Sequence, residues 1–170
     1  MTAPAVCDIG EASTAATPAT GTVRGHRFTF AHRIATPRTV GGGQGYEIFL
    51  SDKPIDCTNA TLEGATTVDI DVAGQPPPAG PYPLINPIAA SAKANEASSD
   101  FNVEDMTCGS VLSDASLSGT LTLTSFVAAK VSGSFDITFQ NKAGASDGSV
   151  AGTFEAIVCP KFPALTCTPH

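Results

Sequence analysis

The clearest pattern in the sequence is an alternation of apolar and polar residues in its last third. A small residue, a glycine, a hydroxyl residue and an apolar residue follow one another at 118–121, 132–135 and 151–154. The apolar side chains of one parity are Leu117, Leu121 and Leu123 in the first run and Val131, Phe135, Ile137 and Phe139 in the second. Successive side chains of a strand point to opposite faces. The pattern therefore predicts three half-buried strands that form an antiparallel C-terminal meander with one face in water.

Shorter alternating runs precede the meander. Residues 22–36 predict a first strand, in which Gly25 marks a bulge or a change of register. Residues 46–50 and 67–72 predict two more strands, with Asp69 and Asp71 on a solvated face. The glycine-rich residues 41–45 predict a hairpin loop, because they lack the sequence of a phosphate-binding loop.

The middle of the chain is rich in proline. Residues 74–83 predict a rigid, extended crossover between sheets, because proline cannot donate to the ladder of a central strand. Residues 89–97 fit either a short helix or an edge strand. Short strands at regular intervals predict an all-β protein, an antiparallel β-sandwich with a flattened β-barrel as the alternative. Residues 1–21 predict a flexible N-terminal tether, and residues 22–170 a single domain.

Composition narrows the functional classes. The 170 residues carry a net charge of −7, which argues against nucleic-acid binding. No apolar run is long enough for a transmembrane helix. The cationic residues Arg24, His26, Arg27, His32, Arg33 and Arg38 fall in one stretch without Asp or Glu. We interpret this stretch as an exposed strand whose charges protect a sheet edge, with an anionic partner as the alternative.

The five cysteines indicate an oxidising compartment. Spacing favours a local Cys159–Cys167 disulfide and a Cys57–Cys108 disulfide between loops, although five cysteines with one left over allow fifteen connectivities. Cys7 then remains in the tether. It fits either a disulfide to Cys108 or Cys167, or the lipid-bearing N-terminal cysteine of a processed bacterial lipoprotein.

Five short segments carry a resemblance to a group of proteins. They are GTVRG at 21–25, LSDKP at 50–54 before Cys57, GPY at 80–82, VSGSF at 131–135 and GTFEA at 152–156 ahead of Cys159. Over about residues 21–159 the chain resembles uncharacterised secreted proteins and lipoproteins of myxobacteria and related bacteria. The resemblance implies a secreted β-sandwich and a Cys57–Cys159 disulfide, which competes with the pairing favoured by spacing. It implies no catalytic residues.

Candidate chemistry in the sequence is sparse. No nucleophile motif occurs, and the strand spacing separates His26 from His32 by about 20 Å, too far for one metal ion. Asp100, Asn102 and Glu104 have the spacing of the first calcium-loop ligands, but Asp105 stands where that loop requires glycine. The sequence therefore predicts no metal and no cofactor. Two catalytic carboxylates could still come from any of the sixteen acids.

These observations favour a non-catalytic extracellular or cell-envelope protein that acts as an interaction or structural module. Its partners would be a cell-surface protein or a glycan. The first alternative is a carbohydrate-binding module that uses the loop residues Tyr46, Tyr82, Asp100 and Asn102. The second alternative is a fibre subunit that self-assembles when the N-terminal tail adds to a neighbouring sheet.

Overall fold

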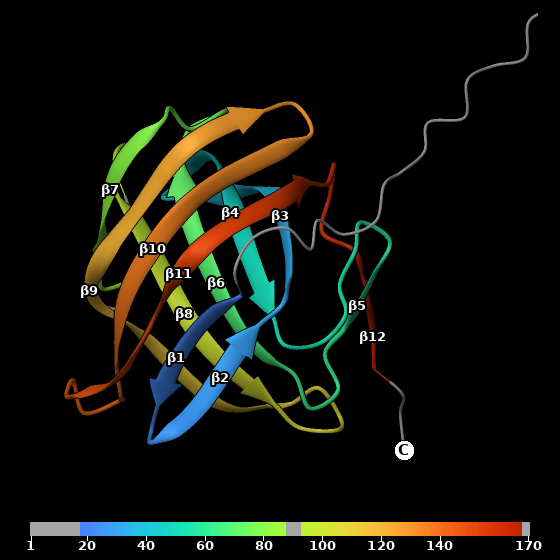
Figure 1. Ribbon diagram of the computed structural model, residues 1–170, viewed down its shortest axis with the longest axis vertical. Helices are drawn as coiled ribbons and strands as arrows, with labels where there is room; N and C mark the ends of the chain where they lie inside the picture. The colour runs from blue at the N-terminus through green and yellow to red at the C-terminus, as the bar shows by residue number, and fades with distance from the viewer. Residues whose placement is uncertain (1–17, 88–92, 168–170) are drawn as a thin grey trace, which may run out of the picture.

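The computed structural model describes residues 18–87 and 93–167 (Figure 1). These residues form strands and connections: β1 Ala19–Val23, β2 His26–Phe30, β3 His32–Val40, β4 Gly43–Ser51, β5 Asn59–Thr61, β6 Thr66–Ala73, β7 Gly80–Ile85, β8 Ala97–Glu104, β9 Ser110–Val127, β10 Lys130–Gln140, β11 Ser146–Val158 and β12 Ala164–Thr166. The described part of the chain has no helix of the length and apolar character that crossing a membrane would need. The predicted all-β class is confirmed.

Ten of the strands form one large, mostly antiparallel sheet that folds into two layers. One layer is β3–β4–β6–β8, the other is β9–β10–β11–β1–β2, and β7 lies between β8 and β9. β8 pairs with β9 on one side, and the end of β11 pairs in parallel with β3 through two residues on the other, while β2 remains an edge strand. The two layers are thus hydrogen-bonded to each other on both sides, which combines features of the predicted sandwich and of its flattened alternative. The predicted meander is confirmed as β9–β10–β11.

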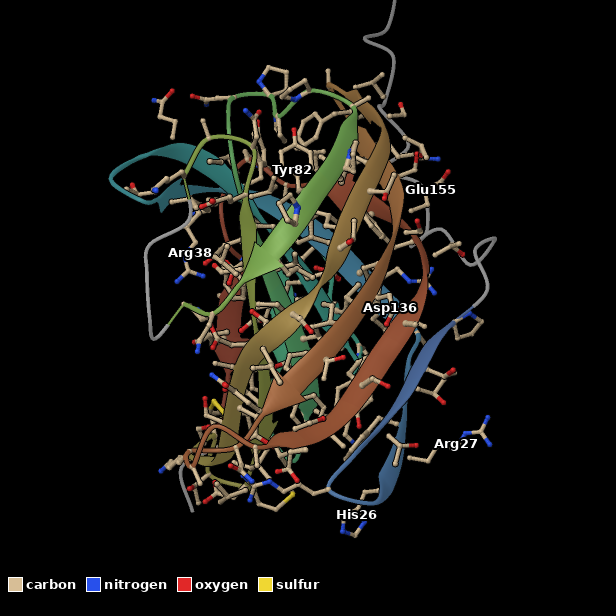
Figure 2. The ribbon with its side chains drawn as sticks, turned by 90° about the vertical axis from the view of Figure 1, so that its left-hand side faces the viewer. His26, Arg27, Arg38, Tyr82, Asp136 and Glu155 are labelled. Atoms are coloured by element: carbon tan, nitrogen blue, oxygen red, sulfur yellow. A yellow bond between two sulfur atoms is a disulfide. The ribbon has the colours of Figure 1, made fainter. Side chains whose placement is uncertain are left out.

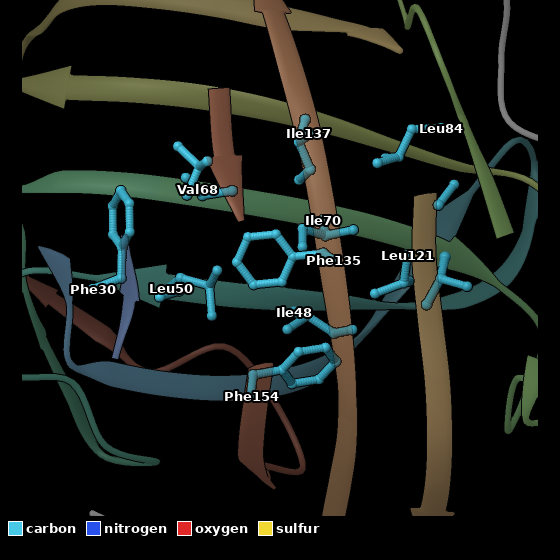
Figure 3. Packing of buried hydrophobic residues seen from close by; sticks show 14 of the residues in the cluster. Phe30, Ile48, Leu50, Val68, Ile70, Leu84, Leu121, Phe135, Ile137 and Phe154 are labelled. Atoms are coloured by element: carbon cyan, nitrogen blue, oxygen red, sulfur yellow. The ribbon is translucent and has the colours of Figure 1, made fainter. Parts of the chain in front are cut away.

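A single apolar core fills the space between the layers (Figure 3). Ile48, Leu50, Val68 and Ile70 come from one layer, and Leu121, Leu123, Phe135, Ile137 and Phe154 come from the other. These residues are the inward parity of their strands, as the alternation in the sequence predicts. Full burial of each such side chain contributes roughly 1.5–3 kcal/mol, so the core also fixes the register of each strand.

The prediction for the first strand is wrong in two respects. The chain reverses at Arg24 and Gly25, whose φ angles of 50° and 76° make a two-residue turn between β1 and β2. Left-handed angles at both positions match the twist of a tight hairpin, so Gly25 marks a turn rather than a bulge. In addition, β1 begins at Ala19, so residues 19–21 belong to the sheet and not to the predicted tether. The remaining tether, 1–17, lies outside the described residues.

The parity predicted for β9 holds only in part. Leu121 and Leu123 are buried, but Leu117 is exposed and Ser116 is buried in its place. The register with β10 shifts at this point, since Thr138 faces Ser118 and Phe139 faces Ser116. Leu117 is the extra residue of a β-bulge, and a bulge reverses the parity of the residues beyond it. The buried Ser116 Oγ donates to the Ile85 carbonyl at 2.7 Å and accepts the Ser99 N–H at 3.1 Å.

The proline-rich segment is only partly a crossover. Its second half forms β7, which pairs with β9 through residues 80–83 and with β8 through residues 84–85. Pro81 and Pro83 are exposed and alternate with the buried Tyr82 and Leu84. At each position β7 pairs with only one neighbouring strand, so the N–H that each proline lacks is not needed for a second ladder. Of the short helix or edge strand predicted at 89–97, residues 89–92 lie outside the described residues, residues 94–95 form a turn, and Ala97 begins β8.

A C-terminal unit covers part of the outer face of the first layer. β12 pairs in parallel with β5, and Ile34, Phe49, Ile55, Ala60 and Cys159 form a second small core beneath them. Phe162 packs edge-on against Phe49 at 5.3 Å between ring centroids. Disulfides Cys57–Cys159 and Cys108–Cys167 fasten this unit.

The disulfides overturn the pairing that spacing favours. Both span long stretches of chain, 102 and 59 residues, whereas spacing favours the eight-residue Cys159–Cys167 loop. The Cys57–Cys159 bond is the one that the resemblance implies. Cys108 and Cys167 are bonded to each other, so neither is left for Cys7, which itself lies outside the described residues. Two disulfides are typical of proteins in oxidising compartments.

Non-reducing peptide mapping is expected to recover Cys57–Cys159 and Cys108–Cys167 as linked peptides. Replacing Cys108 and Cys167 by serine is expected to lower the free energy of unfolding by about 2–4 kcal/mol, because the closed loop is long. Urea denaturation measures this loss. A peptide that links Cys57 to Cys108 would contradict the fold of the C-terminal unit.

Gly133→Ala is expected to destabilise the protein by about 1–3 kcal/mol, because an added methyl group would meet the Thr122 carbonyl and lie 3.0 Å from the Phe154 ring. Gly43→Ala is the control, since its added methyl group lies 3.7 Å from the nearest backbone atom. Thermal unfolding compares the two variants. Equal stability of both would show that β10 does not approach β9 and Phe154 as closely as described.

Candidate functional site

Four carboxyl groups gather on the outer face of the first layer. Glu47 comes from β4, Asp69 and Asp71 from β6, and Asp100 from β8. The register places Glu47 directly opposite Asp71, and Asp69 directly opposite Asp100. We call these four residues the carboxyl cluster. Their strand neighbours of opposite parity are core residues, so the packing of the core determines which carboxyl groups face each other.

The cluster has few partners. Arg38 Nη1 lies 2.7 Å from Glu47 Oε1 and donates to it, and it lies 3.3 Å from Asp71 Oδ1. The second distance is an ion pair without hydrogen-bond geometry, since Asp71 Oδ1 is buried and has no hydrogen bond. Asn102 Nδ2 donates to Asp69 Oδ2 at 3.1 Å, but Asp69 Oδ1 is buried and has no hydrogen-bond partner. Directly opposed like charges destabilise a strand pair, so this arrangement is costly when every group is ionised.

Burial changes the acidity of all four groups. Burial raises the pKa of Asp69 well above its usual value, and the carboxylates of Glu47, Asp100 and Asp71 raise it further. Burial raises the pKa of Asp71 to about 6, although Arg38 acts to lower it. Burial likewise raises the pKa of Asp100 and of Glu47 against the opposing effect of Arg38. Asp71 can therefore exchange a proton at mildly acidic pH.

The cluster corrects one prediction and clarifies another. Asp69 and Asp71 are not simply the solvated face of a strand, because Asp69 is mostly buried among other carboxyl groups. Asp100, Asn102 and Glu104 lie in β8, a strand and not a calcium loop. In the described residues, no group of three or more His, Cys, Asp or Glu side chains is arranged to hold a metal ion.

The structure does not bring the four predicted ligand-binding residues together. All four lie in strands rather than in loops. Tyr82 is 2% exposed and its hydroxyl donates to the Pro78 carbonyl at 2.6 Å (Figure 2). Tyr46 packs edge-on against Phe126, with 4.6 Å between ring centroids. Neither tyrosine presents a free ring to a sugar, while Asp100 and Asn102 belong to the outer face of the first layer.

The cationic stretch divides between three environments. Arg24 binds Asp114 and Asp147, each at 2.7 Å, and Arg38 binds the carboxyl cluster. Arg33 is buried. Only His26 and Arg27 occupy an exposed edge strand, β2, and Figure 2 shows both side chains directed away from the ribbon. Protection of a sheet edge thus fits those two residues, whereas acidic partners account for Arg24 and Arg38.

The second layer presents a broad, hydroxyl-rich outer face. Its outward side chains on β1, β9, β10 and β11 form cross-strand rows: Thr122–Ser134–Thr153, Thr120–Asp136–Ala151–Thr20 and Ser118–Thr138–Ser149–Thr22. We call these residues the hydroxyl face; Asp136, labelled in Figure 2, is its one charged member. Most of its side chains are exposed, and a shallow depression at its edge is lined by Ser132, Ser134, Thr153 and the charged Glu155.

Comparison with known proteins assigns the chain to no family. The chain matches no protein-family profile, and neither a curated protein nor a solved structure is significantly similar to it.

Sequence reasoning missed the carboxyl cluster. The available signal was the alternation TTVDIDVA at 66–73, which marks Asp69 and Asp71 as one face of a strand. That signal does not say which residues stand opposite. Glu47 and Asp100 are 22 and 31 residues away from Asp69 in the chain, and only the register of β4, β6 and β8 makes them neighbours.

Arg38→Gln is expected to lower the free energy of unfolding by about 1–3 kcal/mol at neutral pH, because it leaves Glu47 and Asp71 without their cation. The loss should shrink at about pH 5, where protonated carboxyl groups need no counter-charge. Lys130→Gln is the matched control. Lys130 binds Glu155 at the same 2.7 Å and is 46% exposed against 47% for Arg38, but its pair lies on the other layer.

The control should change stability by less than about 0.5 kcal/mol, as exposed ion pairs usually do. Urea denaturation at both pH values measures each variant. An Arg38→Gln loss that is no larger than the Lys130→Gln loss would show that Arg38 does not compensate the cluster.

Proposed function

We propose that the chain is a non-catalytic, extracytoplasmic module of a bacterial cell envelope or surface, and that it acts through the hydroxyl face. The observation that carries this proposal is the hydroxyl face itself. It extends over four adjacent strands, it carries one charged side chain, and no other described element of the chain packs on it.

The chemistry of this face suits a large, flat partner. Serine and threonine side chains have few rotamers, so holding them still on binding costs less entropy than holding lysine, arginine or glutamate. Each hydroxyl both donates and accepts hydrogen bonds. Such a face can therefore contact a cell-surface protein or a polymer of the envelope without desolvating many charges.

The disulfides support the choice of compartment. Both join the C-terminal unit to distant loops, and such bonds persist where thiols are not kept reduced.

The double variant Thr120→Arg/Thr153→Arg tests the hydroxyl face, because the two residues flank β10 and both are exposed. The control is Thr39→Arg/Gln44→Arg, which adds the same charge to a facing pair on the exposed β3–β4 hairpin. Fluorescently labelled protein would be applied to a glycan array, to peptidoglycan sacculi and to lipopolysaccharide. The proposal expects binding to at least one probe.

We expect roughly tenfold weaker binding or more for the face variant, and unchanged binding for the control. Equal binding by both variants would place the interaction elsewhere. If the wild type bound none of the probes, an envelope-polymer partner would be contradicted. Release of soluble fragments from a probe polymer would contradict the non-catalytic assignment.

A further inference from the structure

The carboxyl cluster has an excess of negative charge that the described residues do not neutralise. Arg38 is the cation whose charge acts on Glu47, Asp69, Asp71 and Asp100 together. Four ionised carboxylates against one guanidinium leave three negative charges in a partly dry site. The other nearby polar groups do not compensate this charge, since Asn102, Ser98 opposite Asp71 and Thr36 opposite Glu47 are all neutral.

Other charged groups lie near these strands, but none of them is among the charges that act on the four carboxyl groups. On β8, Glu104 lies beyond Asn102 and next to Asp105. Before β8, Glu96 Oε2 accepts the backbone N–H of Lys93 at 3.0 Å. On β3 the neighbours of Arg38 on the same face are Thr36 and Ile34, which carry no charge. No described element therefore supplies a second cation to the cluster.

Protons are the counter-charge that fits this geometry. The described carboxyl groups do not make a metal site, whereas a proton on one carboxyl group of an opposed pair removes the repulsion between the two like charges. Within the cluster, Asp69 Oδ1 and Asp71 Oδ1 are the buried oxygen atoms that lack hydrogen bonds. Each opposed pair, Glu47 with Asp71 and Asp69 with Asp100, contains one of them.

We propose that the carboxyl cluster is a proton-binding site that takes up protons from solution between neutral and mildly acidic pH and thereby strengthens the β4–β6–β8 layer. In each step a carboxylate binds one solvent proton and becomes a neutral carboxylic acid. The site is independent of the hydroxyl face, which lies on the other layer.

The direction of the pH effect follows from proton linkage. Folding raises the pKa of these groups, so the folded protein binds more protons than the unfolded chain. The added stability is present near the unfolded value of about 4, and it is lost as pH rises through about 6, the value for Asp71. Asp56 and Asp105 have the opposite effect on the pH dependence of stability, because hydrogen bonds from Thr58 and Thr107 lower their pKa. The stability that these two groups add is lost only at still lower pH.

Urea denaturation of the wild type from about pH 7.5 to about pH 5 tests the proposal. The folding equilibrium constant should rise on acidification, by up to roughly tenfold per pH unit for each proton taken up. Asp71→Asn and Asp69→Asn should fold more favourably than the wild type at about pH 7.5 and should show a shallower pH dependence. Asp136→Asn is the control, because Asp136 is exposed on the hydroxyl face; its pH dependence should match the wild type.

A direct titration keeps the test independent of how the variants fold. Carboxyl ¹³C NMR of the folded wild type should show Asp71 titrating near pH 6. Titration of all four cluster carboxyl groups near pH 4, or a stability that falls on acidification in this range, would overturn the proposal. An equal change of pH dependence in Asp136→Asn would also overturn it, since the effect would then not belong to the cluster.

Discussion

The apolar core shared by the two layers is the constraint on which the rest of the structure depends. Each long strand must turn one parity of its side chains toward this core, and a slip of one residue would exchange the buried and exposed faces. The core therefore fixes register, and register fixes everything on the outside. The opposed carboxyl groups of the first layer and the hydroxyl rows of the second are both consequences of the same inward packing.

The two outer faces have different characters because different elements surround them. The first layer carries the C-terminal unit, whose small apolar core covers Ile34 and Phe49. Beside this unit the carboxyl cluster is only partly open to water, so its charges are costly. No described element packs on the outer face of the second layer, and short hydroxyl side chains can stay there at little cost. Burial rather than residue type distinguishes Asp69 from Asp136, since both are outward aspartates on strands.

The disulfides make the C-terminal unit part of the fold. The three residue pairs between β12 and β5 would contribute little to stability alone, because short two-stranded sheets are marginally stable in water. Cys57–Cys159 anchors the beginning of this unit, and Cys108–Cys167 anchors its end. Both bonds restrict the unfolded chain more strongly than a local loop would. This arrangement covers Phe49 and defines one side of the site in the first layer.

The sequence by itself determined the all-β class and the C-terminal meander, because period-two alternation is a local property that each strand carries in its own residues. It also marked the β3–β4 hairpin through its glycines and suggested an oxidising compartment through its cysteines. It could not give the Arg24–Gly25 reversal, the bulge at Leu117 or the Cys108–Cys167 disulfide, while Cys57–Cys159 was implied by the resemblance and not by spacing. Those features, like the meeting of Glu47 with Asp71 and of Asp69 with Asp100, arise from contacts between distant segments. Only the tertiary structure decides such contacts, because burial of the common core selects the register between strands. No local pattern in the sequence contains the information about that register.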